Sequence, residues 1–368
     1  MKKLLVVVLV LVMATSLIAC TTSNQPTEVV AEAAETNEAE EATEEVEAEV
    51  AEEDSGIPER TGLEPEPTKK EGPIKVGFCP TAMNTHYQIV INGCLQKIEE
   101  LGGEDVIELI IQAPTSQSAQ AEQVNIIEGW LQTGIDAIVI CTANDGAMEP
   151  VFKQAAEKGV PVFEFNQPIS SSINPYYVAN VGYDQYSAGY AIGEWMVNSF
   201  GNDPTKIAVL EGLPGVHNTE RYGGFKDAIA GHDNLNIVAS QPADWVREKG
   251  QSVTENILTS NPDIDVLWGI YDEMALGGLA AVKSRGLLDQ IKVVGYDNTP
   301  DAYEAIVRGE MYATVDTAPK AMGEKIIEAV VKYVMEGEMV PKLINCDVKV
   351  FDQTNIDEFD TDEYEFVK

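Results

Sequence analysis

Ile74-Lys75-Val76-Gly77-Phe78 is a short apolar run, and the residues after it repeat apolar side chains at helical spacing. This alternation continues along the next ninety residues. Strands are expected at 74–78, 106–111, 137–141 and 160–165, and helices at 87–101, 117–132 and 148–158. Short buried strands that alternate with helices of this length predict βαβ units and a parallel sheet.

The same alternation starts again at Lys206-Ile207-Ala208-Val209-Leu210, with further strands expected at 237–238, 266–270 and 292–296. We therefore predict an α/β fold with two doubly wound, Rossmann-like lobes. Ligands of open α/β sheets bind beyond the carboxyl ends of the strands. The loops expected to face a shared ligand are 79–87, 142–145, 166–168, 211–221, 271–273 and 297–300.

The N-terminus consists of two lysines, an apolar stretch over residues 4–13, and Leu17-Ile18-Ala19-Cys20. It resembles a bacterial lipoprotein signal peptide spanning residues 1–20, in which Cys20 is lipidated and becomes the new N-terminus. The alternative is an ordinary secretory signal with a chance cysteine. Two or more acyl chains hold a protein firmly to a bilayer. We expect the protein on the outer face of the cytoplasmic membrane, held there only by its lipid.

The segment that follows is acidic. Residues 21–71 carry 17 acidic side chains against three basic ones, and they include no Phe, Tyr or Trp. Such a segment cannot bury enough apolar surface to offset its ordering entropy. It predicts a disordered tether over residues 21–72, with loose cation binding as the alternative. The net charge of −37 for the whole chain argues against nucleic acid and anionic membranes as partners.

The sequence lacks the usual signatures of an enzyme. It contains no Gly-x-Ser-x-Gly, no Walker-type Gly-rich loop and only three histidines, so we predict no catalytic activity, no cofactor and no metal. The folded part has four cysteines and no C-x-x-C, which argues against a zinc site. Buried free thiols are expected, although two that end neighbouring strands could pair. These cysteines are Cys79, Cys94, Cys141 and Cys346, the possible pair being Cys79 and Cys141.

Three runs, residues 240–245, 271–277 and 294–301, resemble the ribose-binding and galactose/glucose-binding proteins, and the likeness extends over residues 74–350. Those are type I periplasmic binding proteins that serve sugar ABC transporters. The lactose-repressor family shares this core, but its N-terminal helix-turn-helix does not fit an acidic tether. The resemblance implies a three-crossing hinge between an N-terminal lobe, 73–183 plus 318–345, and a C-terminal lobe, 184–317 plus 346–368.

The resemblance also implies a function, in which a monomeric protein holds a neutral monosaccharide between its lobes and hands it to a membrane permease. A pyranose has an apolar face that stacks on aromatic rings and a rim of hydroxyls that needs polar partners. The mixture of matches to the two binders, with Trp245 at the stacking tryptophan of the glucose binder, favours a hexose over a pentose. Two alternatives stay open: a sensor that presents its ligand to a receptor, and a different polar ligand such as a polyol or nucleoside.

Position by position, the resemblance implies ten ligand contacts: Asn84, His86, Tyr87, Asn166, Gln167, Arg221, Trp245, Tyr271, Asp297 and Thr317. Arg221 matches the clamp arginine of the ribose binder, and Asp297 matches an aspartate that accepts ligand hydroxyls in both families. His217 and Asn218 are the alternatives to Arg221 on its loop. Tyr271 and Thr317 depart from the family pattern, which leaves the identity of the sugar open.

Overall fold

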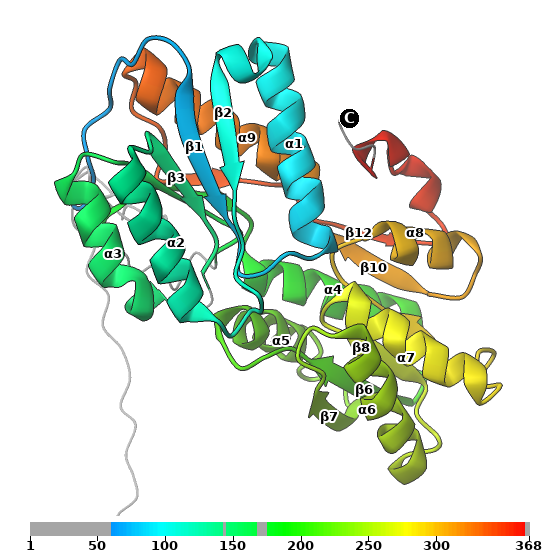
Figure 1. The fold of residues 1–368 in the computed structure, drawn as a ribbon. Coiled ribbons are helices and arrows are strands. Elements are labelled where there is room, and N and C mark those ends of the chain that lie inside the picture. Colours follow the sequence, from blue (N-terminus) through cyan, green and yellow to red (C-terminus); the bar gives the residue numbers. More distant parts are fainter. Residues whose placement is uncertain (1–59, 143–144, 168–174, 365–368) are drawn as a thin grey trace, which may run out of the picture. The chain divides into compact units, whose positions relative to one another are not determined.

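The computed structural model describes residues 60–142, 145–167 and 175–364, which form two β-sheets flanked by helices (Figure 1). The first sheet has the order β11-β5-β4-β3-β1-β2, and its paired strands run parallel. We call this sheet and its helices the N-lobe. Its strands are β1 (Ile74–Cys79), β2 (Ile107–Ile111), β3 (Ala137–Ile140), β4 (Val162–Phe165), β5 (Tyr177–Gly182) and β11 (Leu343–Asn345). Its helices are α1 (Thr85–Leu101), α2 (Gln120–Thr133), α3 (Asp145–Glu157) and α9 (Pro319–Val331).

The second sheet has the order β12-β10-β9-β8-β6-β7, parallel except for the β10–β12 pair, which is antiparallel. We call this sheet and its helices the C-lobe. Its strands are β6 (Thr205–Glu211), β7 (Leu235–Pro242), β8 (Val266–Gly269), β9 (Lys292–Val294), β10 (Ala313–Asp316) and β12 (Lys349–Asp352). Its helices are α4 (Gln185–Phe200), α5 (Val216–Ala228), α6 (Arg247–Ser260), α7 (Asp272–Ser284) and α8 (Pro300–Val307).

The chain passes from one sheet to the other three times, after β5, after β10 and after β11. The central strands are buried along their whole length, as parallel strands covered on both faces must be. In the N-lobe, Val76 and Phe78 pack into the core that includes α1 and α9, whereas Cys79 joins the core beneath α2 and α3. The predicted two-lobed α/β fold with a three-crossing hinge is confirmed.

Helices α4 and α5 approach each other closely because glycines lie at their contact. A Cβ atom on Gly189 would lie 2.0 Å from the carbonyl oxygen of Arg221, and one on Gly224 would lie 2.0 Å from that of Tyr186. Any larger residue at either position would force the helices apart. The glycines therefore fix the place of Arg221 relative to the hinge end of α4.

The end of the predicted tether differs from the sequence expectation. Residues from Arg60 to 72 are attached to the N-lobe: the backbone N–H of Thr68 donates to the carbonyl of Tyr333 at 2.8 Å, and that of Lys70 donates to Val334 at 2.9 Å. The hydroxyl of Tyr333 also donates to the Pro65 carbonyl. A boundary at residue 72 is therefore too late, because backbone pairing holds this segment although its composition is polar. Residues 21–59 lie outside the described part.

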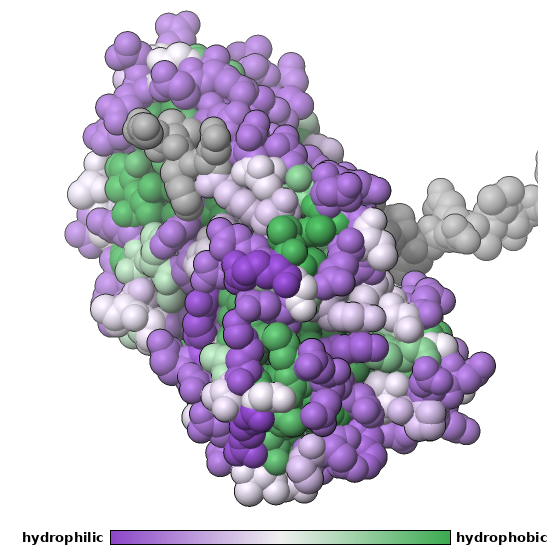
Figure 2. Space-filling model, turned by 90° about the vertical axis from the view of Figure 1, so that its right-hand side faces the viewer, coloured by the Kyte–Doolittle hydropathy of each residue, from purple (hydrophilic) through white to green (hydrophobic). Residues whose placement is uncertain are grey.

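The four cysteines of the folded part are buried, and none of them forms a disulfide within the described residues. Burial raises the pKa of Cys79 to about 12 and that of Cys346 to about 11, so these thiols stay protonated at neutral pH. The face drawn in Figure 2 is mostly hydrophilic, with apolar residues in small groups. Within the described residues, no helix combines the length and the apolar character that a membrane crossing requires.

Candidate ligand-binding site

A cavity of about 620 Å³, counting the part that opens to solvent, lies between the two lobes. Its walls come from the loops that follow strands β1, β4, β6, β7, β8 and β9, together with Gln117 from the loop before α2. This is where two facing parallel sheets are expected to hold a ligand. The lining residues are Thr81, Asn84, His86, Tyr87, Gln117, Asn166, Leu213, Pro214, Gly215, His217, Asn218, Arg221, Trp245, Tyr271 and Asp297.

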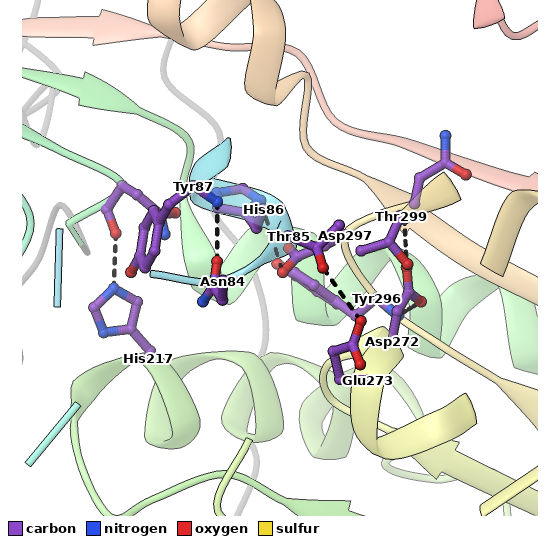
Figure 3. A network of polar contacts seen from close by, with 12 residues as sticks. Asn84, Thr85, His86, Tyr87, His217, Asp272, Glu273, Tyr296, Asp297 and Thr299 are labelled. Atoms are coloured by element: carbon purple, nitrogen blue, oxygen red, sulfur yellow. Dashed lines mark hydrogen bonds and ion pairs between the residues drawn. The ribbon is translucent and has the colours of Figure 1, made fainter. Parts of the chain in front are cut away.

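The N-lobe wall is built at the start of α1. Asn84 caps this helix, since its side-chain oxygen accepts the backbone N–H of Tyr87 at 2.9 Å (Figure 3). The Tyr87 hydroxyl is already engaged, 3.2 Å from the hydroxyl of Thr81 and 3.3 Å from the sulfur of Cys141. Burial raises the pKa of Tyr87 well above its ordinary value. This residue therefore lines the cavity as a neutral phenol.

His86 faces the other lobe. Its Nδ1 lies 3.8 Å from Oδ2 of Asp297, and both side chains are at most 5% exposed. Burial lowers the pKa of His86, so the imidazole is neutral at pH 7 and has one donor and one acceptor nitrogen. Asp297 is held in the left-handed region at φ 100°, with its backbone N–H donating to the Val315 carbonyl at 2.7 Å.

Arg221 is the cation of the C-lobe wall, and its side chain is 5% exposed. Nε donates to the side-chain oxygen of Gln185 at 2.7 Å, Nη2 to the hydroxyl of Tyr183 at 2.9 Å, and Nη1 to the carbonyl of Ile270 at 3.1 Å. The guanidinium carbon also lies 4.1 Å from the ring centre of Tyr296. With three of its N–H groups bound to the protein, the guanidinium is fixed in place before any ligand arrives.

Trp245 has a strained backbone. It lies at φ 66° and follows Asp244 at φ 54°, two consecutive left-handed residues that are not glycine. Its backbone N–H donates to the sulfur of Met274 at 3.3 Å. A Cβ atom on Gly212 would lie 1.9 Å from the indole carbon Cζ2, so only glycine leaves room for this ring position. The indole is half-buried and lies edge-on to Tyr271, with ring centres 6.3 Å apart.

The loop that carries Asp297 is organised by Asp272, which is fully buried (Figure 3). The Asp272 carboxylate accepts the backbone N–H of Thr299 at 2.6 Å, the backbone N–H of Tyr296 at 2.7 Å and the hydroxyl of Thr314 at 2.8 Å. Burial raises the pKa of Asp272 to about 8, against the lowering effect of these donors. Asp272 therefore holds the loop that carries Asp297 in place without lining the cavity itself.

Four buried polar atoms of the cavity wall have no hydrogen-bond partner among the described residues: both ring nitrogens of His86, the hydroxyl of Tyr271 and Oδ1 of Asp297. Leaving such a group unpaired costs about 1–3 kcal/mol. They come from both lobes and converge on one cavity. A ligand rich in hydroxyl groups would give each of them the partner that the protein does not supply.

Eight of the ten residues expected at the site line the cavity, and two do not. Gln167 is buried and donates to the carbonyl of Thr142 at 2.8 Å and to its hydroxyl at 3.1 Å. Thr317 is fully buried at the second crossing between the lobes, outside the cavity wall. Neither residue therefore belongs to the cavity wall, where the family pattern had suggested a direct contact.

His217 and Asn218, the alternatives to Arg221, line the cavity beside it. His217 Nε2 lies 2.7 Å from the carbonyl oxygen of Asn166 and thereby joins the two lobes. Asn218 accepts the Gly212 N–H at 2.8 Å and so holds its own loop. Sequence reasoning missed five lining residues, Thr81, Gln117, Leu213, Pro214 and Gly215. The loops holding Thr81 and Leu213–Gly215 were expected at the site, but no ligand contact was assigned to these members.

The described residues contain no group of three or more His, Cys, Asp or Glu side chains placed to hold a metal ion. A wall with one arginine, one aspartate and a half-buried indole is suited to binding a small polar molecule. Two parallel α/β lobes that enclose such a cavity define the class of two-lobed ligand-binding proteins.

The family model of the periplasmic binding protein domain matches residues 76–339, so this chain belongs to that family of solute-binding proteins, which are not enzymes. The galactofuranose-binding protein YtfQ of Escherichia coli is 28% identical over 277 residues, covering 74% of this chain and 85% of that protein. The ribose import binding protein RbsB of Haemophilus influenzae is 31% identical over 274 residues, covering 74% and 89%. A solute-binding protein of Actinobacillus succinogenes with bound D-allose superimposes with a TM-score of 0.72 at 27% identity, covering 78% of this chain and all of that one.

Proposed function

We propose that this protein binds a neutral monosaccharide in the cavity between its lobes and delivers it to an ABC permease. The observation that carries the proposal is the set of unpartnered polar atoms on His86, Tyr271 and Asp297, which converge on a cavity that Trp245 borders. Sugar hydroxyls donate and accept at once, so they can pair with all of these atoms. The relatives support the same class, because their names specify galactofuranose and ribose.

The charges of the wall favour a ligand without net charge. Arg221 and Asp297 lie 3.9 Å apart and balance each other. Burial, and to a smaller extent the positive charge of the nearby Arg221, lowers the pKa of His217 to about 4. This imidazole is therefore neutral at pH 7, like that of His86. A sugar acid would bring a charge for which the wall holds no free counter-ion among its described residues.

A hexose is the favoured ligand. The indole of Trp245 offers a flat surface to the C–H face of a six-membered sugar, and the D-allose complex of the Actinobacillus protein shows that this fold accepts a hexose. The protein acts as a monomer in this proposal, since one chain supplies both walls of the cavity.

Calorimetry of the purified protein tests the proposal, with D-allose, D-galactose, D-ribose, D-fructose and myo-inositol as titrants. We expect at least one hexose to bind with a Kd of about 1 µM or lower, about 8 kcal/mol, and to raise Tm by mass action. Heat and stabilisation from myo-inositol alone would indicate a polyol binder. If no sugar binds while a nucleoside or an amino acid does, the sugar class is wrong.

The proposal places the protein outside the cytoplasm, anchored by a lipid on Cys20. Residues 1–20, which carry this prediction, lie outside the described part. Cys20→Ala is expected to release the protein from the membrane fraction, or to leave it unprocessed, with unchanged ligand affinity. The check is membrane fractionation with mass measurement of the mature chain. A variant that sediments with membranes at the mature size would show that Cys20 is not the anchor.

A signalling role in place of transport would leave the same cavity. Deletion of the gene for this protein separates the two, because loss of a transport receptor abolishes sugar uptake, whereas loss of a sensor abolishes only the response. We expect uptake to be lost.

A further inference from the structure

Gln185 occupies a special place at the first crossing between the lobes. It is the first residue of α4, directly after the chain leaves β5, and it is fully buried. It does not line the cavity. Its side-chain oxygen accepts Nε of Arg221 at 2.7 Å, and its Nε2 donates to Oδ1 of Asn166 at 3.0 Å and, more weakly, to the Asn166 carbonyl at 3.4 Å.

These two partners belong to opposite walls. Asn166 follows β4 of the N-lobe and Arg221 lies on α5 of the C-lobe, and both line the cavity. One buried amide therefore joins a cavity residue of each lobe, using its acceptor for one and its donor for the other. Gln185 can reach both residues because it lies where the chain passes from β5 of the N-lobe to α4 of the C-lobe.

We propose that Gln185 is a positioning residue that couples the two walls of the ligand site through the hinge. The inference rests on the proposed function, because it concerns how that ligand site is set. Asn166 is in the left-handed region at φ 53°, and its N–H donates to the Val181 carbonyl at 2.9 Å. Gln185 holds the side chain of this residue and, at the same time, the orientation of the Arg221 guanidinium.

The coupling forms one continuous chain of contacts. His217 Nε2 lies 2.7 Å from the Asn166 carbonyl, Asn166 accepts from Gln185, and Gln185 accepts from Arg221. The His217 contact lies in the cavity wall, where opening of the lobes separates its partners. The Gln185 contacts lie at the crossing, where relative movement is smallest. They can therefore persist in the open protein and align both walls before the ligand binds, which lowers the ordering cost of binding.

The test compares Gln185→Ala with wild type by titrating D-allose, D-galactose and D-ribose in parallel. We expect Gln185→Ala to weaken binding of whichever of these sugars the wild type binds by tenfold or more. In an Asn166→Ala background the same substitution should have a clearly smaller effect, because the path through Asn166 is already broken. Equal effects in both backgrounds would overturn the coupling.

Gln123 provides the matched control. It is also a buried glutamine, and its Nε2 donates to the carbonyls of Pro80 and Cys141 at 3.0 and 2.9 Å, within the N-lobe alone. Gln123→Ala should lower the unfolding midpoint about as much as Gln185→Ala but leave sugar affinity unchanged. Affinity losses that follow the stability losses in both variants would show that Gln185 is merely structural.

A readout without ligand separates this inference from the proposed function. Dyes on Asn125 of α2 and Asn256 of α6, both exposed, report the distance between the lobes by single-molecule energy transfer. Gln185→Ala should broaden the distance distribution of the unliganded protein, and Gln123→Ala should not. If none of the sugars binds the wild type, the proposed function fails while this result still decides on the hinge coupling. An unchanged distribution overturns the inference.

Discussion

The two walls of the cavity differ in how firmly their polar groups are held. On the C-lobe wall, Arg221 makes three hydrogen bonds to the protein, and Trp245 is held in a strained backbone conformation. On the N-lobe wall, both nitrogens of His86 lack a partner among the described residues. Arg221 and Trp245 therefore form a preorganised platform on the C-lobe wall. His86 gains its hydrogen bonds only when a ligand fills the cavity, as do the Tyr271 hydroxyl and Oδ1 of Asp297 on the C-lobe wall.

Contacts between the walls show the lobes drawn together. The hydroxyl of Thr85 donates to Glu273 at 3.4 Å, and His217 contacts the carbonyl of Asn166. Glu273 is itself held by Arg247, with Nε and Nη2 donating at 2.6 and 3.0 Å. Glu273 of the C-lobe is therefore fixed by Arg247 in advance, and Thr85 of the N-lobe is the group that docks onto it. The comparison predicts larger losses of affinity from changes in the C-lobe wall.

The largest effect is expected for Trp245→Ala. Loss of an anchor aromatic should weaken monosaccharide binding by about 2–4 kcal/mol, measured by calorimetry. The unfolding free energy of the unliganded protein should change much less, because the indole is only half-buried.

Trp268 is the matched control, since it is fully buried and its ring centre lies 4.2 Å from that of Phe225. Trp268→Ala should cost about 3–5 kcal/mol of stability. If Trp245→Ala behaves like Trp268→Ala and leaves affinity intact, Trp245 belongs to the scaffold.

Asp297→Asn comes next. The carboxylate should accept ligand hydroxyls, and loss of such a charged hydrogen bond is expected to cost about 1.5–3 kcal/mol of binding free energy, measured by calorimetry. His86→Ala removes its neighbour across the cleft, 3.8 Å away, and should cost only about 0.5–1.5 kcal/mol, as for a neutral hydrogen bond. The reverse order would make the N-lobe the dominant wall and contradict the comparison.

Much of this arrangement could be predicted from sequence. The alternation of strands and helices predicted both sheets, and therefore which loops meet at the cavity. Strand β11 was not singled out because it has only three residues, and β5 because it ends in Asn180-Val181-Gly182. Asn166 lines the cavity, whereas the side chain of its neighbour Gln167 donates to Thr142. The backbone of Asn166 lies in the left-handed region at φ 53°, and the composition of the sequence does not encode this change of direction.

Contacts between segments far apart in the chain could not be predicted from the sequence either. The bridge at Gln185 joins residues 19 and 36 positions away, and the attachment of Thr68 joins residues 265 positions apart. Such pairs depend on tertiary packing and leave no periodicity in the chain. The ligand roles of the individual side chains stay predictions that the variants decide.

Gly212→Ala tests whether the platform depends on the place of its indole. The new Cβ would overlap the Trp245 ring, so the ring must move. We expect Gly212→Ala to bind the monosaccharide about tenfold more weakly than wild type, about 1.4 kcal/mol. The change in tryptophan fluorescence on ligand addition should also differ between the variant and wild type. Gly129→Ala is the control, because a Cβ there meets nothing within 4 Å and the residue lies on α2, outside the cavity wall. Equal affinities of the two variants would show that the indole position is not critical.

The smallest effect concerns His217, the C-lobe group that contacts Asn166. Burial, followed by Arg221, lowers its pKa to about 4, whereas an unfolded chain has the ordinary value of about 6.5. Between these values the unfolded chain binds a proton that the folded chain does not, so stability falls as the pH falls from 6.5 towards 4.

His217→Gln cannot titrate, yet its amide can still donate to the Asn166 carbonyl. The unfolding free energy of wild type relative to this variant should therefore drop by about 1 kcal/mol between pH 6.5 and 5.5. Buried Asp272 and Asp316, whose pKa values are raised, act in the opposite direction but are common to both proteins and cancel in the difference. A pH-independent difference in denaturant melts would mean that His217 is solvated and that the two walls are not closed on each other at this contact.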